Sequence, residues 1–386
     1  MRVDDGALLP VGTNVHLPVR VREPDNLTAA MTMTTTLRHQ VQRRVTTVRV
    51  VYGNWYNHLG QDRPGPNVIT VSADIEIRGT RTAVTFAGDH WVRIEPGGAV
   101  ISDPVPVNLP KAGHLTSRTT VSATAAGRIP LGPQTNADDG EAAVAGPPPP
   151  AASTAPSTAY GYGPWQLLAA AGAPTPGQGS PATVLVTGDS NAVGFGDRRG
   201  TACHLGWVRR ALDGRVPVVN LAVSGATARG ALTAASRRRR EVLLQWVRPE
   251  LAVAALGTND LQGGGPELAD MQAMLTAHWR ELVDLGAEVV ACTLPPVTFS
   301  RDGWRSVAGQ TPDAGREVRA RVNAWIRSVP APLAGVVDLA GALAAPSEPD
   351  RWASGLTDDG LHPNAAGHAA AAAAVRAPGL VPLLGA

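Results

Sequence analysis

Four short polar segments carry residue types that together can perform nucleophilic chemistry. They are Gly188-Asp189-Ser190-Asn191, residues 220–227, Gly257-Thr258-Asn259-Asp260, and Asp359-Gly360-Leu361-His362-Pro363. A serine hydroxyl is a weak nucleophile until a neighbouring base takes its proton, and histidine titrates in the range suited to that task. A carboxylate that fixes the histidine tautomer completes such an arrangement. The pattern therefore predicts Ser190 as nucleophile and His362 as general base and acid.

The same segments offer an orienting carboxylate and donors for a developing negative charge. Asp359 lies three residues before His362, close enough on a turn to bind the ring nitrogen that faces away from the serine. Tetrahedral intermediates need hydrogen-bond donors at the oxyanion. We expect three such donors, which are the backbone N–H of Ser190, the backbone N–H of Gly225 and the side-chain amide of Asn259. Glycine suits this role because the missing Cβ lets the backbone approach a substrate.

Alternating strands and helices are expected to position these segments. The predicted strands are residues 183–187, 216–223, 251–256, 288–293 and 335–339. The predicted helices are residues 207–212, 228–247, 268–285, 314–328 and one that begins at Asn364. This alternation indicates one sheet of five parallel strands with helices on both faces. The carboxyl ends of parallel strands share one edge, so we expect the four segments to converge there.

In this order, the four segments resemble the signature blocks of the SGNH hydrolases, also called GDSL-type esterases and lipases. The resemblance covers about the last 205 residues. It implies a three-layer α/β/α, flavodoxin-like domain, the roles given above for Ser190, His362, Gly225 and Asn259, and no metal or organic cofactor. The family spacing selects Asp359 over its neighbour Asp358 as the orienting carboxylate. Asn191 stands where leucine is common in the family.

The first part of the chain has a different pattern. Residues 69–77 alternate Ile, Val and Ala with polar side chains, as expected of a half-buried strand. Similar runs occupy residues 45–52, 81–86, 91–94, 100–107, 115–123 and 160–170. Several short strands with turn residues between them predict a β-sandwich. The Pro-rich segment 146–156 suits an exposed spacer. We therefore expect an all-β sandwich domain at residues 1–175 and the catalytic domain at residues 176–386.

Composition excludes several function classes. The 34 Lys and Arg against 32 Asp and Glu give a net charge of +2, which is no electrostatic footprint for nucleic acid. The single lysine, Lys111, lies outside any phosphate-binding loop motif, so a P-loop nucleoside triphosphatase is excluded. No apolar stretch is long enough to span a bilayer. Met1–His16 lacks a signal peptide, which fits a cytoplasmic protein or a secreted one whose leader has been removed.

Several features carry two interpretations. Cys203 and Cys292 are expected either as buried thiols or as one disulfide. Residues 295–312 form either an ordinary surface loop or a lid that shapes the substrate site. For the four arginines at residues 237–240 we expect a solvated face rather than an anion-binding patch. His368, in the last helix, is expected at the surface.

Aromatic residues of the first region allow a comparable choice. Trp55, Tyr56 and Trp91 are expected in the sandwich core rather than in a sugar-stacking platform.

The predicted function is hydrolysis of a small-molecule or glycan carboxylic ester through an acyl-serine intermediate. The alternatives are an acyltransferase or carbohydrate O-acetylesterase that uses the same site, and a glycan-binding module on an inactive hydrolase scaffold. An α/β-hydrolase is disfavoured because residues 188–192 lack the final glycine of its nucleophile elbow.

Overall fold

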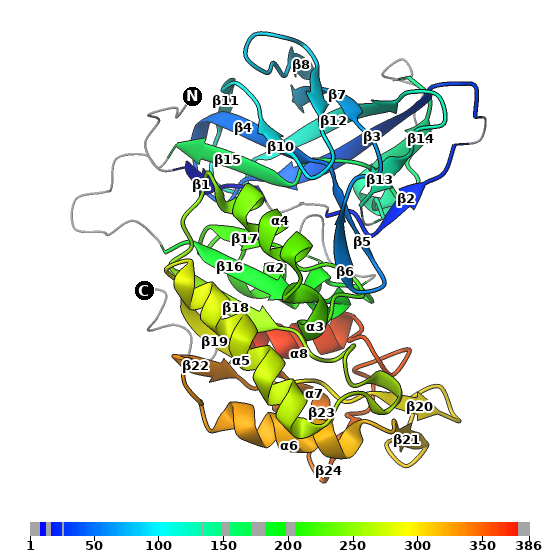
Figure 1. Ribbon diagram of the computed structural model, residues 1–386, viewed down its shortest axis with the longest axis vertical. Helices are drawn as coiled ribbons and strands as arrows, with labels where there is room; N and C mark the ends of the chain where they lie inside the picture. Colours follow the sequence, from blue (N-terminus) through cyan, green and yellow to red (C-terminus); the bar gives the residue numbers. More distant parts are fainter. Residues whose placement is uncertain are drawn as a thin grey trace. The chain divides into compact units, whose positions relative to one another are not determined.

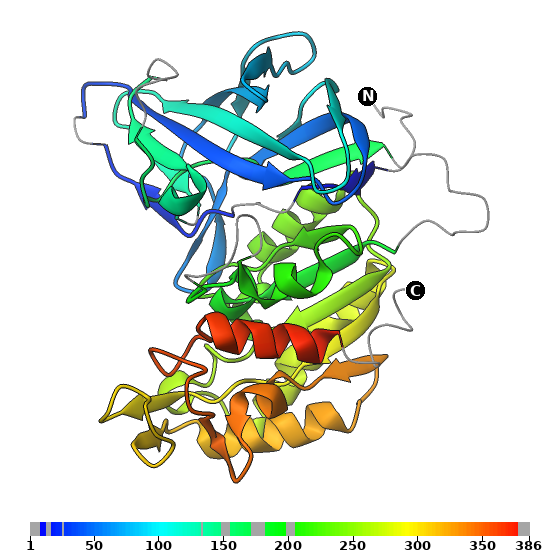
Figure 2. The same ribbon diagram turned by 180° about the vertical axis from the view of Figure 1, so that it is seen from behind.

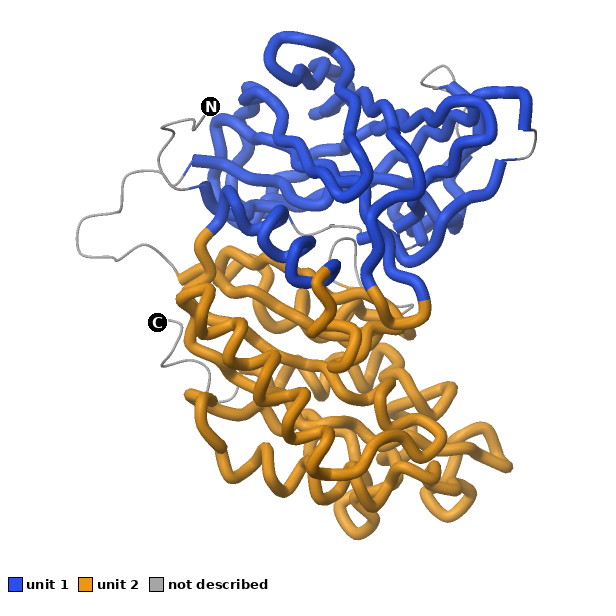
Figure 3. Tube along the Cα trace, viewed as in Figure 1, with its two compact units in different colours: residues 1–58, 62–178, 235–247 blue, residues 59–61, 179–234, 248–386 orange. Residues whose placement is uncertain are grey.

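A computed structural model describes residues 8–12, 17–24, 27–132, 134–147, 155–170, 182–197 and 205–376 (Figure 1). The chain divides into two compact units (Figure 3). The first comprises residues 1–58, 62–178 and 235–247, and the second comprises residues 59–61, 179–234 and 248–386. The domain boundary expected after residue 175 lies outside the described residues. Across the described ranges, no helix combines the length and apolarity needed to cross a bilayer.

The first unit contains two antiparallel sheets, as the period-two pattern predicts. One sheet has the order β1 (Leu8–Pro10), β15 (Gln166–Ala170), β4 (Val45–Gly53), β10 (Ala99–Ile101), with β11 (Val105–Leu109) also paired to β4. The other has the order β14 (Ala142–Ala145), β3 (Met31–Gln40), β12 (His114–Ala123), β7 (Ile69–Ile77), β8 (Thr80–Ala83), with β9 (Val92–Ile94) also paired to β7. Apolar side chains of both sheets form one buried core, and on β7 they alternate with more exposed polar ones.

Smaller strand pairs complete the first region of the sequence. They are β2 (Arg20–Arg22) with β13 (Ile129–Leu131), and β5 (Trp55–His58) with β6 (Gln61–Pro64). Trp55 is buried as expected, and Tyr56 is half-buried. The prediction is wrong for Trp91, whose side chain is 54% exposed. Trp91 precedes β9 in a turn and therefore has no place on an inward-facing strand position.

The second unit contains the predicted sheet of five parallel strands. Its order is β17 (Val218–Asn220), β16 (Val184–Gly188), β18 (Leu251–Ala255), β19 (Glu288–Cys292), β22 (Gly335–Val337). In chain order this reads 2-1-3-4-5, the flavodoxin-like order of doubly wound sheets. The direction in which the sheet grows reverses at β16, so loops after β16, β17 and β18 leave the same edge side by side.

Helices lie on both faces of this sheet (Figures 1 and 2). One face bears α2 (Gly206–Leu212), α7 (Leu339–Leu343) and α8 (Ala365–Val375). The other bears α5 (Leu268–Asp284) and α6 (Arg316–Arg327). Apolar side chains of β16, β18, α2 and α8 share one buried core. This arrangement confirms the expected three-layer α/β/α domain.

The helix predicted at residues 228–247 is two helices, α3 (Ala228–Ala231) and α4 (Ala234–Leu244). At the break, the Thr233 hydroxyl donates to the carbonyl of Gly230, 2.9 Å away. Such side-chain bonds to the backbone compete with helix continuation. The expected solvated face is present at Arg237 and Arg238, which are exposed, but the expectation is wrong for Arg239 and Arg240, which are 7% and 5% exposed. Arg239 can be buried because its Nε lies 3.0 Å from the carboxylate of Asp62.

A hydrogen bond between the two sheets of the first unit provides a test of this core. The hydroxyl of Tyr52 on β4 lies 2.9 Å from that of Thr119 on β12, and both side chains are buried. Tyr52→Phe removes one partner and leaves the Thr119 hydroxyl buried, so we expect the free energy of unfolding to fall by about 1–2 kcal/mol. Urea unfolding measures the change. The double variant Tyr52→Phe/Thr119→Val should recover part of the loss, and no recovery would contradict this role.

Candidate active site

Ser190 lies two residues after the end of β16, at the first position of the short helix α1 (Ser190–Val193). Asp189 caps that helix, because its Oδ1 accepts a hydrogen bond of 2.9 Å from the N–H of Asn191. The serine is 7% exposed. The strand and the cap together fix where the hydroxyl points.

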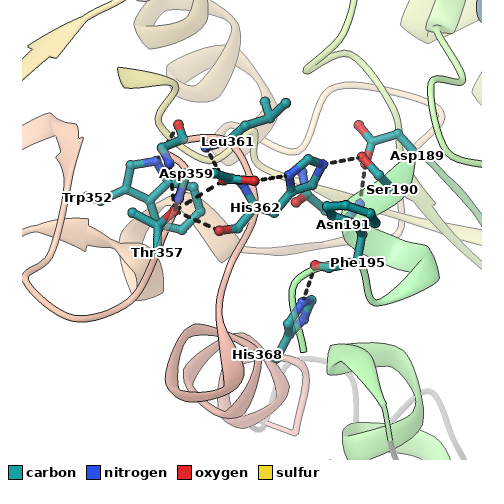
Figure 4. A network of polar contacts seen from close by, with 11 residues as sticks. Asp189, Ser190, Asn191, Phe195, Trp352, Thr357, Asp359, Leu361, His362 and His368 are labelled. Carbon is teal, nitrogen blue, oxygen red and sulfur yellow. Dashed lines mark hydrogen bonds and ion pairs between the residues drawn. The ribbon is translucent and has the colours of Figure 1, made fainter. Parts of the chain in front are cut away.

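A chain of two hydrogen bonds joins Ser190 to the other end of the sequence (Figure 4). The Oγ of Ser190 lies 2.9 Å from Nε2 of His362. Nδ1 of His362 lies 2.6 Å from Oδ2 of Asp359. A carboxylate can only accept, so Nδ1 carries the proton and Nε2 is left to accept from the serine hydroxyl. The structure therefore brings together the three residues predicted to act on the substrate.

Asp359 is held by its own loop although its side chain is 47% exposed. Its Oδ1 accepts from the backbone N–H groups of Leu361 and His362, at 2.9 and 2.8 Å. Partial burial opposes ionisation, but the His362 ring and these backbone donors outweigh it and lower the pKa of Asp359 to about 2. Asp359 is thus a carboxylate at neutral pH, the state needed to orient His362.

Gly360 anchors the Asp359–His362 loop to neighbouring segments. Its carbonyl accepts from the N–H of Thr298 and from Nε1 of Trp352, both at 2.9 Å. Its φ is +73°, and a Cβ there would lie 2.1 Å from the Thr298 carbonyl, so glycine is required. Thr298 begins β20 (Thr298–Ser300), which pairs with β21 (Gln310–Pro312) in the region predicted as a surface loop or lid. That hairpin supports the loop that carries His362.

The three expected oxyanion donors lie in the loops after β16, β17 and β18. In the described part of the chain, neither the N–H of Ser190 nor that of Gly225 is hydrogen-bonded to a protein acceptor. Gly225 is exposed with φ +83°, and a Cβ there would meet open space. The amide of Asn259 donates to the Ala226 carbonyl at 2.9 Å, which leaves its second N–H for another acceptor.

Two further residues hold these loops together, and the sequence reasoning assigned no role to them. Asp260 accepts from the N–H groups of Ala228 and Arg229, at 2.7 and 3.1 Å, at the start of α3. Asn220 donates from its side chain to the Ala192 carbonyl at 3.1 Å. A carboxylate near a helix N-terminus is a favourable arrangement that a sequence can show when the two are adjacent. Asp260 lies 31 residues or more from the N–H groups that it binds, so the local sequence did not reveal this contact.

The expectation that His368 lies at the surface is wrong, because its side chain is fully buried. Its Nδ1 accepts from the N–H of Trp207 at 3.1 Å, and its Nε2 donates to the carbonyl of Phe195 at 3.0 Å. Burial lowers the pKa of His368 to about 4, so it is neutral. The Phe195 ring lies 4.5 Å from the His362 ring, centroid to centroid. His368 thus holds the segment that packs on His362.

Asp189 is a buried carboxyl group beside the hydrogen-bonded chain. It is 1% exposed, and within the described residues its Oδ2 has no hydrogen-bond partner. Burial raises the pKa of Asp189 to about 6, against the opposing hydrogen bond from Asn191 and the nearby His362. At the end of β19, Cys292 has a buried free thiol, whereas Cys203 lies outside the described residues.

Comparison with protein families matches the part of the chain that contains the candidate active site. Residues 186–370 match the model of the GDSL-like Lipase/Acylhydrolase family. These residues include all four polar segments and the five residues predicted to act on the substrate. No curated protein matches the sequence of this chain.

Solved structures to which this chain is similar include two that match about half of it and one that matches most of it. TesA is 26% identical, with a TM-score of 0.37, over 52% of this chain and 99% of TesA. The esterase EstA from Pseudoalteromonas sp. is 21% identical, with a TM-score of 0.34, over 50% of this chain and 93% of EstA. The protein YxiM from Bacillus subtilis is 18% identical, with a TM-score of 0.36, over 88% of this chain and 79% of YxiM.

The buried carboxyl group of Asp189 predicts a pH-dependent stability. Because its folded pKa is raised from 3.8 to about 6, stability is greatest with the proton bound and falls as pH rises through 6. A shift of about two pKa units corresponds to about 3 kcal/mol. Asp189→Asn stays neutral and keeps an acceptor for the Asn191 N–H. We therefore expect the unfolding free energy of the variant, relative to wild type, to rise by up to about 3 kcal/mol between pH 4 and pH 7. Urea unfolding at several pH values measures this difference, and a flat difference would contradict the assignment.

Proposed function

We propose that this chain hydrolyses carboxylic esters through an acyl intermediate on Ser190, a proposal supported by the match of residues 186–370 to the model of the GDSL-like Lipase/Acylhydrolase family. The observation that carries the proposal is the continuous hydrogen-bonded chain from Asp359 through His362 to Ser190. It lies at the carboxyl edge of the parallel sheet, beside β16, where the strand order reverses. Ligands of doubly wound sheets bind at this position.

Acylation begins with attack of Ser190 Oγ on the ester carbonyl carbon. His362 Nε2 takes the hydroxyl proton as the new C–O bond forms, and the carbonyl electron pair moves onto oxygen. Asp359, ionised and bonded to Nδ1, stabilises the imidazolium. The N–H groups of Ser190 and Gly225 and the amide of Asn259 donate to the oxyanion. Collapse of the intermediate breaks the bond to the alcohol, which leaves with the proton from His362.

Deacylation repeats the sequence with water as nucleophile. His362 removes a proton from water, the resulting hydroxide adds to the acyl carbon, and the same donors receive the second oxyanion. Breaking the bond to Ser190 Oγ releases the carboxylic acid, and His362 returns the proton to the serine. The Phe195 ring packs beside the His362 imidazole. The chain's own residues thus perform every proton transfer of the cycle.

Replacement of the nucleophile tests the proposal directly. We expect Ser190→Ala to abolish hydrolysis of p-nitrophenyl acetate, butyrate and octanoate while thermal unfolding stays close to wild type. Release of p-nitrophenol measures turnover across the three chain lengths. A p-nitrophenyl phosphonate should label wild type at Ser190, as mass spectrometry can locate, and leave the variant unlabelled. A Ser190→Ala protein with wild-type turnover would refute the mechanism.

The side-chain amide of Asn259 provides a second test. Asn259→Ala removes one donor to the oxyanion, so we expect kcat to fall by about 10²–10³ with a small change in KM. Steady-state kinetics on p-nitrophenyl acetate separates the two constants. Glu76→Ala serves as a control, because Glu76 lies on β7 of the first unit and its carboxylate pairs with Arg81 on the neighbouring strand β8. An unchanged kcat for Asn259→Ala would remove Asn259 from the oxyanion site.

A further inference from the structure

The β5–β6 hairpin has a two-residue turn. Leu59 and Gly60 join β5 to β6, and their φ angles are +51° and +78°. Positive φ at both central positions is the mark of a type I′ hairpin turn. The two arms belong largely to the first unit, whereas residues 59–61 belong to the second (Figure 3). A short piece of the N-terminal region is therefore an integral part of the second unit.

Within the second unit, Gly60 packs against the loop that carries the proposed oxyanion donor Gly225. A Cβ on Gly60 would lie 2.8 Å from the Gly225 carbonyl oxygen and 3.0 Å from Cγ2 of Thr227. The carbonyl of Gly60 accepts from the Thr227 hydroxyl at 3.4 Å. That carbonyl would also lie 1.9 Å from a Cβ on Gly230, so the two backbones are in direct contact. Glycine is required on both sides of this contact.

The opposite side of the same loop is held by the segment after β18. Asn259 donates to the Ala226 carbonyl, and Asp260 accepts from the first N–H groups of α3. Gly225 itself, with no Cβ and φ +83°, has the backbone freedom to turn its N–H away from a substrate. Contact of Gly60 with the Gly225 carbonyl restricts that rotation. The loop that carries Gly225 therefore contacts the turn 59–60 on one side and the segment 259–260 on the other.

Beside the turn, Asp62 on strand β6 lies in a buried polar cluster. In the first unit, the carboxylate of Asp62 accepts from the Ser236 hydroxyl at 2.7 Å and from the Asn57 amide at 3.2 Å. It also pairs with Nε of Arg239 at 3.0 Å, and the side chains of this pair are only 5% and 9% exposed. A buried polar cluster thus fixes the arm two residues after Gly60, which a loose surface turn would lack.

We propose that the turn 59–60 positions the loop that carries Gly225 and Thr227, which we call the oxyanion loop, and that Gly60 is a positioning residue for ester hydrolysis. The proposal rests on the function given above for Ser190 and Gly225. Gly60 touches no reacting atom. It acts by keeping the backbone at Gly225 in the orientation that presents its N–H to the developing oxyanion. Its effect therefore belongs to the chemical step and is independent of the length of the acyl chain.

A matched pair of glycines makes this testable. Gly79 occupies the equivalent position of the β7–β8 turn, with φ +81°, but a Cβ there meets nothing within 4 Å. Gly60→Ala and Gly79→Ala therefore carry the same backbone strain, and only the first presses on Gly225. We expect a lower melting temperature for both, with the larger decrease for Gly60→Ala, because its Cβ also meets the Gly225 carbonyl. Gly60→Ala should lower kcat about 10- to 100-fold with little change in KM, equally for acetate and octanoate esters, because it weakens one oxyanion donor. Gly79→Ala should keep wild-type kcat and KM.

The outcomes separate this inference from the proposed function. If Ser190→Ala is inactive and Gly60→Ala has the kinetics of Gly79→Ala, the positioning role is overturned and the esterase stands. If Ser190→Ala keeps wild-type turnover, both fail. A loss confined to KM, or to one chain length, would also overturn the role. Should Gly60→Ala prevent folding, Gly60→Asn and Gly79→Asn replace the pair, because asparagine tolerates positive φ yet still adds a Cβ.

Discussion

Parallel pairing of β16 with both β17 and β18 is the constraint on which the candidate site depends. Neighbouring strands lie about 5 Å apart, and parallel strands end on one edge. The loops that begin after these three strands must therefore meet. They do so through backbone contacts such as the 3.0 Å bond from the N–H of Val223 to the carbonyl of Gly188. The sheet consequently brings Ser190, Gly225 and Asn259 to one edge, and the conformations of their loops set the final distances between them.

Short polar contacts hold the more exposed part of the site in place. Asp359 is nearly half exposed, yet two backbone N–H groups and the His362 ring orient its carboxylate. The carbonyl of Gly360 is held in turn by Thr298 and Trp352. Preorganised donors and acceptors cost little reorganisation when charge develops, which is the property that the proposed oxyanion donors require.

Contributions to this site come from far apart in the sequence. Gly60 and Thr227 are 167 residues apart, and the chain between them includes most of the β-sandwich. Tight backbone contact of this kind needs glycine at both partners, as at Gly60 and Gly230. The turn 59–60 thus belongs to the second unit, although the strands on either side of it belong largely to the first.

The sequence alone determined the α/β domain's five strands, their parallel pairing and the sandwich pattern, because side-chain periodicity and strand–helix alternation are local signals. It also singled out Ser190, Gly225 and Asn259, which follow apolar strands, and Asp359 and His362, which precede the last helix, because the four polar segments resemble the signature blocks of one family in their order. Only the tertiary structure decided the rest. Burial of His368 and Arg239 depends on partners distant in sequence, Phe195 and Asp62, which no local pattern contains. The break between α3 and α4 goes with a local bond from the Thr233 hydroxyl to the Gly230 carbonyl, which the helical pattern of the sequence did not reveal. The contact of Gly60 with the loop that carries Gly225 joins segments distant in sequence, and such contacts exist only in the folded chain.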